Sequence, residues 1–216
     1  MLVGERMSRP VLSVSPDTPI QEALAQMRKE RVSRYPVINK KGKLVGIVSE
    51  EDLLHASPSD ATSLSVWEIN YLVSKITVER VMTTEVITVM EDTPLEEAAR
   101  IMADHRVGGL PVLKGKAVVG MITQTDLFRV FLEMLGARES GVRVTALVKE
   151  EPGVLHNLTK AIDKAGGNII ALSTFAGEST EDREVTLKVN QIDERGIRNA
   201  LAPYIIEIKD LREMHF

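Results

Sequence analysis

The sequence predicts an α+β fold, made of a duplicated N-terminal region and a smaller C-terminal domain. Two observations predict it. Residues 7–53 can be laid over residues 82–127, with the same motifs in the same order. After Gly136 these motifs stop, and strand-like alternation takes turns with helical periodicity. An internal repeat of this kind decides the architecture of the chain.

The duplicated motifs are Asp-Thr-Pro, Pro-Val and Gly-x-x-Ser/Thr-x-x-Asp. The last motif reads GIVSEED at residues 46–52 and GMITQTD at residues 120–126. Each copy predicts the order β-α-β-β-α, because runs of strand character alternate with apolar residues at helical spacing. The first strands end at Val14 and Val89. The paired strands are expected at residues 35–38 with 44–48, and at 110–113 with 117–122.

Helix starts are also repeated. We expect Thr18 and Thr93 to cap the first helices, with the proline that follows each threonine as the first helical residue. Ser49 and Thr123 are expected to open the second helices.

A repeat of about 55 residues with one-sided elements cannot bury enough apolar surface alone. The two copies should therefore pack face to face as a pseudo-twofold module with paired clefts. Between them, the residues from Ser65 onward predict an amphipathic helix, in which Trp67 is favoured as a packing or interface anchor over a ligand-stacking role. The expected domains are a first repeat over residues 1–60, a linker helix over 61–75, a second repeat over 76–135 and a C-terminal domain over 140–216.

The C-terminal domain predicts the ferredoxin-like order β-α-β-β-α-β. Its first strand is VRVTALV, and a proline-started helix follows that Gly166 and Gly167 end. The strands IIALSTFAG and REVTLKVN come next, then the helix DERGIRNALAPY and the closing strand IIEIKDL.

Composition narrows the classes of protein. The 216 residues carry a formal charge of -4 and no cysteine. A general affinity for nucleic acid or anionic membranes is not expected, since phosphate binding needs clustered Lys and Arg. Disulfides and thiolate chemistry are excluded. No apolar run reaches the length of a membrane span, so a cytoplasmic protein is expected.

The duplicated motifs resemble a tandem pair of CBS domains, a module that binds adenosine nucleotides or S-adenosylmethionine. In the C-terminal part, EEPGVL and the later GGNI resemble the ACT domain, a regulatory fold that often binds amino acids. That family usually has aspartate where this chain has Glu150. The whole order is similar to the acetoin-utilisation (AcuB-type) CBS-ACT proteins. The resemblance implies a regulatory protein without catalytic activity.

The repeated Gly-x-x-Ser/Thr-x-x-Asp motif has a physical use in ligand binding. A strand-to-helix step presents free amides and the positive end of the helix dipole, which attract phosphate. A carboxylate three residues later can accept both hydroxyls of a ribose. The resemblance implies that Asp52 and Asp126 hold ribose, and that the backbone near Pro36 and Pro111 lines an adenine pocket. The candidate nucleotide-binding residues are Thr18, Arg34, Pro36, Ser49, Asp52, Thr93, Gly109, Pro111, Gly120, Thr123 and Asp126.

A capping box gives the same motif a purely structural explanation, because the acid can satisfy the amides of its own helix. Both explanations stay open for a single copy, and the repetition favours binding. Glycines at 46 and 120 are expected to let a ligand approach the strand backbone.

The two copies are not equivalent. Glu50 and Glu51 repel a phosphate in the first copy, and Gly108-Gly109 leave room beside a base in the second. The Asp126 pocket is therefore predicted to be the better nucleotide site. Arg34, with Arg31 nearby, is the counterargument, because a guanidinium can neutralise phosphate.

In the C-terminal domain, the amides after Pro152-Gly153 are expected to accept a ligand carboxylate, while Asn168 bonds its amino group. Helix capping alone explains the same residues equally well. The candidate effector residues are Glu150, Gly153, Val154, Leu155, Asn168 and Ile169.

No catalytic or metal-binding constellation is apparent, because the four histidines are scattered and no nucleophile motif is present. The sequence therefore predicts a sensor without an obligatory cofactor. Its ligand is AMP, ADP, ATP or S-adenosylmethionine, with an amino acid as a second effector and an unidentified target protein. A homodimer is expected. The alternative is a structural or dimerisation protein with vestigial clefts.

Overall fold

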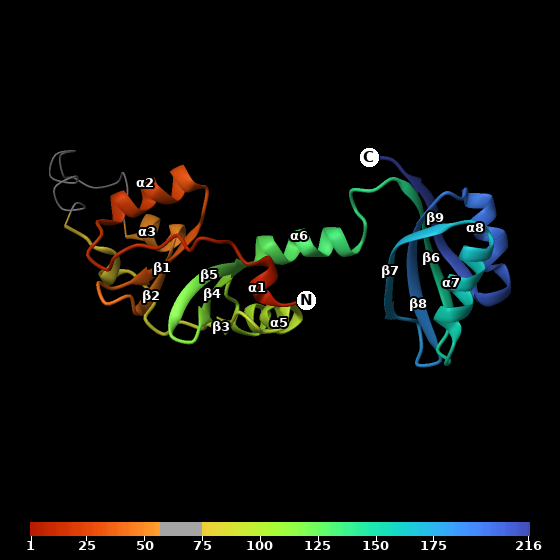
Figure 1. The fold of residues 1–216 in the computed structure, drawn as a ribbon, viewed down its shortest axis with the longest axis horizontal. Helices are drawn as coiled ribbons and strands as arrows, with labels where there is room; N and C mark the ends of the chain where they lie inside the picture. The colour runs from red at the N-terminus through yellow and green to blue at the C-terminus, as the bar shows by residue number, and fades with distance from the viewer. Residues whose placement is uncertain (57–74) are drawn as a thin grey trace. The chain divides into compact units, whose positions relative to one another are not determined.

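The computed structural model describes residues 1–56 and 75–216, and the chain divides into two compact units, Met1–Leu127 and Phe128–Phe216 (Figure 1). The predicted linker helix, with Trp67, lies outside the described residues except for Lys75.

The first repeat contains α2 (Ile20–Glu30), β1 (Arg34–Ile38), β2 (Leu44–Ser49) and α3 (Glu50–His55). The strands pair antiparallel, and Val14 joins β1 through a single parallel bridge. One apolar face of α2 packs on the sheet, as its helical spacing predicts. The buried residues of this core are Val14, Ile20, Ala23, Met27, Tyr35, Val37, Val48, Leu53 and Val78.

The second repeat has the same order, with β3 (Val89–Met90), α5 (Leu95–His105), β4 (Gly109–Lys114), β5 (Ala117–Thr123) and α6 (Gln124–Met134). Its three strands form one sheet in the order β3-β4-β5. The predicted β-α-β-β-α order is confirmed in the second copy, whereas in the first copy the leading strand is reduced to the single bridge of Val14. The ends of the paired strands differ from the predicted bounds by at most one residue.

Each repeat sends its leading segment onto the other repeat. The short helix α1 (Val3–Arg6) bonds to the second repeat, where Val3 N donates to Thr93 O at 2.9 Å. The 3-10 helix η1 (Val78–Arg80) bonds to the first repeat, where Val78 N donates to Thr18 O at 2.9 Å. This reciprocal crossing, which the repeat alone did not predict, links the two copies into one unit.

Two predictions about helix starts and glycines are wrong. The first helices begin at Ile20 and Leu95, after Pro19 and Pro94, and neither threonine side chain caps them. The carbonyls of Thr18 and Thr93 instead accept hydrogen bonds from the crossing segments.

Gly46 and Gly120 meet neighbouring side chains rather than open space for a ligand. A Cβ at Gly46 would lie 2.5 Å from Met82 Sδ, and one at Gly120 would lie 2.5 Å from Met7 Sδ. Met7 and Met82 are equivalent positions of the repeat. Glycine is therefore required here for the close approach of the crossing segment.

The second unit has the predicted β-α-β-β-α-β order. It contains β6 (Gly141–Lys149), α7 (Val154–Lys164), β7 (Asn168–Ala176), β8 (Asp182–Asn190), α8 (Glu194–Leu201), the 3-10 helix η2 (Ala202–Tyr204) and β9 (Glu207–Met214). The four strands are antiparallel in the order β7-β8-β6-β9, which is the ferredoxin-like arrangement. Both helices cover one face of the sheet (Figure 1).

Helix α7 begins later than predicted. Gly153 has φ 90° and precedes the helix, so Pro152 lies in the turn and not at the first helical position. The acidic residues Glu150 and Glu151 accordingly lie outside the first turn.

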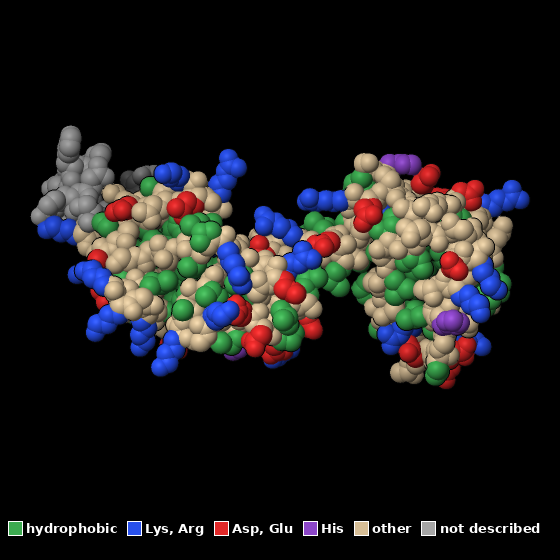
Figure 2. Space-filling model, in the orientation of Figure 1, with side chains coloured by type: hydrophobic (Ala, Val, Ile, Leu, Met, Phe, Trp, Pro, Cys, Tyr) green, Lys and Arg blue, Asp and Glu red, His purple; other side chains and the backbone are tan. Residues whose placement is uncertain are grey.

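Acidic and basic side chains are mixed over the visible face of each unit (Figure 2). Among the described residues, no helix is long and apolar enough to cross a membrane.

Candidate functional site

Both repeated acids cap their own helices. In the first copy, Asp52 Oδ2 accepts from Ser49 N at 2.8 Å and from Ser49 Oγ at 2.7 Å, while Asp52 N donates to Ser49 Oγ at 3.2 Å. In the second copy, Asp126 Oδ2 accepts from Thr123 N at 3.0 Å and from Thr123 Oγ1 at 2.6 Å. These are capping boxes, so the structural explanation of the motif holds in both copies.

The two carboxylates differ in what remains available. Both bonds to Asp52 fall on Oδ2, and no residue within 1–56 or 75–216 donates to its Oδ1. Asp52 is half-buried, whereas Asp126 is only 7% exposed. Capping therefore leaves one oxygen of Asp52 available to a ligand.

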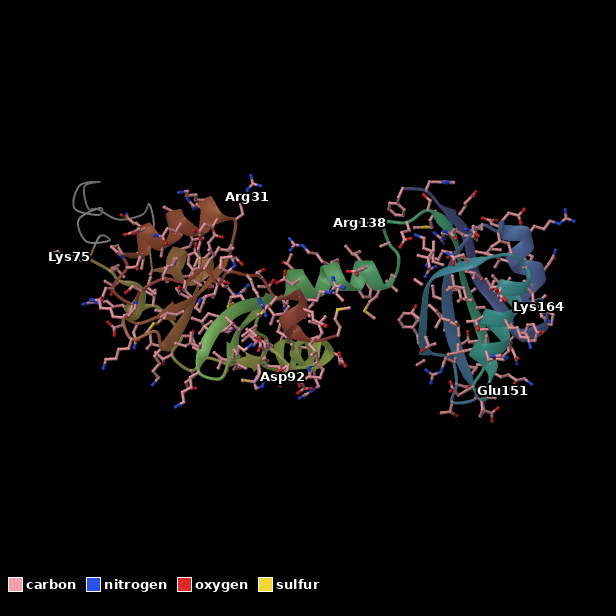
Figure 3. The ribbon with its side chains drawn as sticks, viewed as in Figure 1. Arg31, Lys75, Asp92, Arg138, Glu151 and Lys164 are labelled. Carbon is pink, nitrogen blue, oxygen red and sulfur yellow. The ribbon has the colours of Figure 1, made fainter. Side chains whose placement is uncertain are left out.

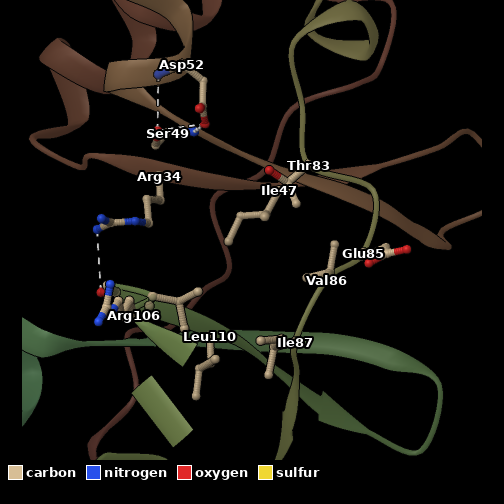
Figure 4. Close-up of a pocket in the computed structure, with 13 residues that line it drawn as sticks. Arg34, Ile47, Ser49, Asp52, Thr83, Glu85, Val86, Ile87, Arg106 and Leu110 are labelled. Atoms are coloured by element: carbon tan, nitrogen blue, oxygen red, sulfur yellow. Dashed lines mark hydrogen bonds between the residues drawn. The ribbon is translucent and has the colours of Figure 1, made fainter. Parts of the chain in front are cut away.

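A cavity of about 290 Å³ lies beside Asp52 (Figure 4). Its walls come from both repeats of the first unit, because the chain that leads into β3 runs past β2. Ile47 of β2 and Thr83 exchange two backbone bonds of 2.9 Å at this point. The lining residues are Arg34, Ile47, Ser49, Asp52, Thr83, Glu85, Val86, Ile87, Arg106, Val107, Gly108, Gly109 and Leu110.

The cavity brings four of the predicted residues together, namely Arg34, Ser49, Asp52 and Gly109. The others do not line it. Pro36 and Pro111 are buried within β1 and β4, and the Pro36 carbonyl accepts from Val14 N at 3.2 Å. The remaining predicted residues outside the cavity are Thr18, Thr93, Gly120, Thr123 and Asp126.

Glu50 and Glu51 do not line the Asp52 cavity either. Glu50 Oε1 lies 3.7 Å from Arg28 Nε. Both acids instead line an adjacent cavity of about 320 Å³ that shares Arg34 and Ser49 with the Asp52 cavity, so their repulsion of a phosphate stays a prediction.

The space beside Gly108 and Gly109 is filled by Arg34. A Cβ at Gly108 would lie 2.4 Å from Arg34 Nη2, and one at Gly109 would lie 3.6 Å from Arg34 Cδ. Arg34 Nη1 also donates to Gly108 O at 3.5 Å, a long bond that crosses between the repeats. The glycines thus accommodate the Arg34 side chain, and they line the Asp52 cavity and not a pocket beside Asp126.

Seven lining residues carry no sequence motif that singled them out as ligand-binding: Thr83, Glu85, Val86, Ile87, Arg106, Val107 and Leu110. Arg106 is the left-handed residue that ends α5, with φ 54°, and Arg31 ends α2 in the same way with φ 57°. This repeated arginine after each first helix is the signal that could have drawn attention to Arg106.

The predicted effector residues of the second unit do not form one site. Glu150 is ion-paired with Arg183, and Asn168 Nδ2 donates to Asn190 Oδ1 at 3.1 Å. Gly153 and Asn168 lie at opposite ends of α7, whose ends Glu151 and Lys164 mark in Figure 3. An 11-residue helix is roughly 16 Å long, too far for one amino acid to bridge.

A smaller cavity of about 170 Å³ lies at the start of α7. Of the predicted effector residues, only Val154 lines it. Its lining residues are Lys149, Glu151, Val154, Asn157, Pro203, Tyr204, Ile205 and Ile206.

The described part of the chain contains no group of three or more His, Asp or Glu side chains that could hold a metal ion. His55, His105, His156 and His215 are dispersed over both units.

Comparison with known proteins shows the family to which the first unit belongs. The CBS domain model matches residues 3–59 and 78–133, more than half of the chain. An L-aspartate semialdehyde sulfurtransferase of Methanocaldococcus jannaschii is 30% identical over 131 residues, which cover 60% of this chain and 23% of that protein. The chain therefore spans less than a quarter of this curated relative.

Three solved structures are similar to the same region. The CBS domain pair of protein MJ0100, in complex with 5′-methylthioadenosine and S-adenosyl-L-methionine, has a TM-score of 0.52 and 29% identity, covering 64% of this chain and 98% of that one. A structure described as that of an acetoin utilization protein (AcuB) from Vibrio cholerae has a TM-score of 0.53 and 28% identity, covering 64% of this chain and 95% of that one. CBSX2 in complex with AMP has a TM-score of 0.50 and 30% identity, covering 61% of this chain and 96% of that one. The chain belongs to the CBS domain family and carries two CBS domains in tandem.

Proposed function

We propose that this protein is a non-catalytic regulatory sensor that binds an adenosine-type ligand in the cavity beside Asp52. The observation that carries the proposal is that Asp52 lines a cavity built by both repeats and has a second carboxylate oxygen that its own helix does not use. This reverses the ranking that the sequence favoured, because Asp126 is buried and does not line the cavity.

The cavity wall offers a partner for each part of an adenosine. Asp52 Oδ1 accepts a ribose hydroxyl, and Ser49 lies beside it. The apolar side chains of Ile47, Val86 and Leu110 suit the faces of a purine, which gains by leaving water. Related CBS pairs crystallised with AMP, or with 5′-methylthioadenosine and S-adenosylmethionine, support this class of ligand.

Binding in this cavity is expected to alter how the two repeats pack. One wall comes from β1 and β2, and the other from the chain before β3 and the start of β4. A ligand that touches both walls stabilises one relative arrangement over others, and regulation requires such a difference in affinity between states.

The second unit is proposed to be an ACT domain, which makes the chain an AcuB-type protein involved in acetoin utilisation. Its strand order and the similarity of the CBS pair to AcuB support this assignment. We further propose a homodimer and an amino acid effector at the second unit. The scattered positions of the predicted effector residues weigh against a site within a single copy of that unit.

Isothermal titration of the full chain with AMP, ADP, ATP and S-adenosylmethionine tests the sensor. At least one compound is expected to bind, and Asp52→Ala is expected to abolish that binding while Asp126→Ala retains it in the folded fraction. If Asp126→Ala removes binding and Asp52→Ala does not, the assignment to the Asp52 cavity is wrong.

A structural protein with vestigial clefts is the second candidate, and one observation favours it: both repeated acids are already engaged in capping boxes. This candidate predicts an unchanged mass and an unchanged melting curve with every adenosine compound.

A further inference from the structure

Two arginines from different repeats line the Asp52 cavity. Arg34 lies at the start of β1, and Arg106 ends α5. Figure 4 draws both on the side of the cavity away from Glu85. The cavity therefore has one end with two guanidinium groups.

Neither guanidinium is neutralised by a carboxylate within residues 1–56 and 75–216. Arg34 Nη1 donates only to neutral oxygens, Gly108 O at 3.5 Å and Ser33 Oγ at 3.4 Å, and both distances are at the long limit for a hydrogen bond. The carboxylate of Asp52 is engaged with Ser49 instead. Both guanidinium groups thus lie at the cavity wall without a carboxylate bonded to either.

Arg34 has no arginine equivalent in the second repeat. The repeat makes Arg106 equivalent to Arg31, whereas it makes Arg34 equivalent to Gly109. Arg34 and Gly109 both line the cavity, so this pair of positions supplies its wall with one guanidinium.

We propose, on the basis of the function proposed above, that Arg34 and Arg106 bind the phosphate of a 5′-phosphorylated adenosine ligand. Guanidinium groups form short, charge-assisted and often paired bonds with phosphate oxygens. The same two charges repel the sulfonium of S-adenosylmethionine and gain nothing from an uncharged nucleoside. The cavity consequently selects nucleotides, and a bound phosphate draws Arg34 from its long bond with Gly108 O.

Titration of the full chain with AMP, adenosine and S-adenosylmethionine tests this selectivity. AMP is expected to bind at least about tenfold more tightly than the other two, as a charge-assisted pair implies. Arg34→Gln and Arg106→Gln should each lower the affinity for AMP to nearly that for adenosine, and the affinity for adenosine should not change. Glutamine removes the charge and keeps a polar amide at the end of a shorter side chain.

Arg31→Gln is the matched control. Arg31 has the same left-handed backbone as Arg106, is exposed, and does not line the cavity. In Figure 3 its side chain projects away from the repeat at the end of α2. This variant should bind AMP as the unaltered chain does, and the melting temperatures of all three variants separate contact effects from folding effects.

The outcomes distinguish this inference from the sensor proposal. Equal affinity for AMP and adenosine, lost together in Asp52→Ala, keeps the sensor and overturns phosphate selection. A preference for AMP that survives both arginine replacements overturns the assignment to Arg34 and Arg106. Absence of binding by every adenosine compound overturns both proposals.

Discussion

Replacement of Asp52 by asparagine should separate helix capping from ligand binding. The amide oxygen can still accept from Ser49 N and Oγ, the two bonds that Oδ2 accepts at 2.8 and 2.7 Å. We expect Asp52→Asn to change the free energy of unfolding by less than about 0.5 kcal/mol. Asp52→Ala removes both bonds at a half-buried site and should cost about 1–2 kcal/mol.

The effect on binding should be larger for the asparagine variant than its effect on stability. At the position of Oδ1 the variant presents an amide NH₂, a donor where a ribose hydroxyl needs an acceptor. Loss of one hydrogen bond to a charged group corresponds to about 1.5–3 kcal/mol, which lowers the affinity for AMP roughly 10- to 150-fold.

Calorimetry provides both measurements. Differential scanning resolves the transitions of the two compact units, which a single two-state curve would combine. Isothermal titration with AMP gives the affinity, and Asp126→Asn serves as the control in the other repeat. The reasoning is refuted if Asp52→Asn binds AMP as tightly as the unaltered chain, because the carboxylate would then serve only as a cap.

Three further changes test the packing around the site. Gly120→Ala would place a methyl group 2.8 Å from Ser8 O, and this overpacking should lower the free energy of unfolding by about 1–3 kcal/mol, measured by urea unfolding. Burial, and next the hydrogen bond to the Glu30 carboxylate, raises the pKa of Tyr35. The stability that the protonated phenol contributes is therefore present below pH about 10 and is lost as the pH rises further. Urea titrations above pH 10 should show this loss, and Tyr35→Phe should remove the pH dependence. Gly108→Ala would place a methyl group 2.4 Å from Arg34 Nη2, and should weaken AMP binding with little change in the unfolding midpoint.

The candidate site was predictable only in part. The repeated motif located Ser49 and Asp52, because a strand-to-helix step with a hydroxyl and an acid has a local meaning. The same motif could not say which copy has a free carboxylate oxygen. That difference depends on burial, and Asp126 is 7% exposed because of what packs over it.

Glycine was the least informative residue type. Gly46 and Gly108 both suggested space for a ligand, yet Met82 Sδ and Arg34 Nη2 approach them so closely that a Cβ would lie 2.5 and 2.4 Å away. A missing side chain shows that something comes near, and the sequence does not identify the neighbour.

The sequence by itself determined the duplicated α-β-β-α order, the leading strand of the second repeat, the β-α-β-β-α-β order of the second unit and the capped start of α3 at Ser49. These follow from local rules, since periodicity and capping act over a few residues. Only the tertiary structure decided that α1 and η1 cross to the opposite repeat, and that Arg34 and Arg106 line one cavity beside Asp52. Contacts between residues more than 50 positions apart depend on how whole elements pack, which no short stretch of sequence specifies.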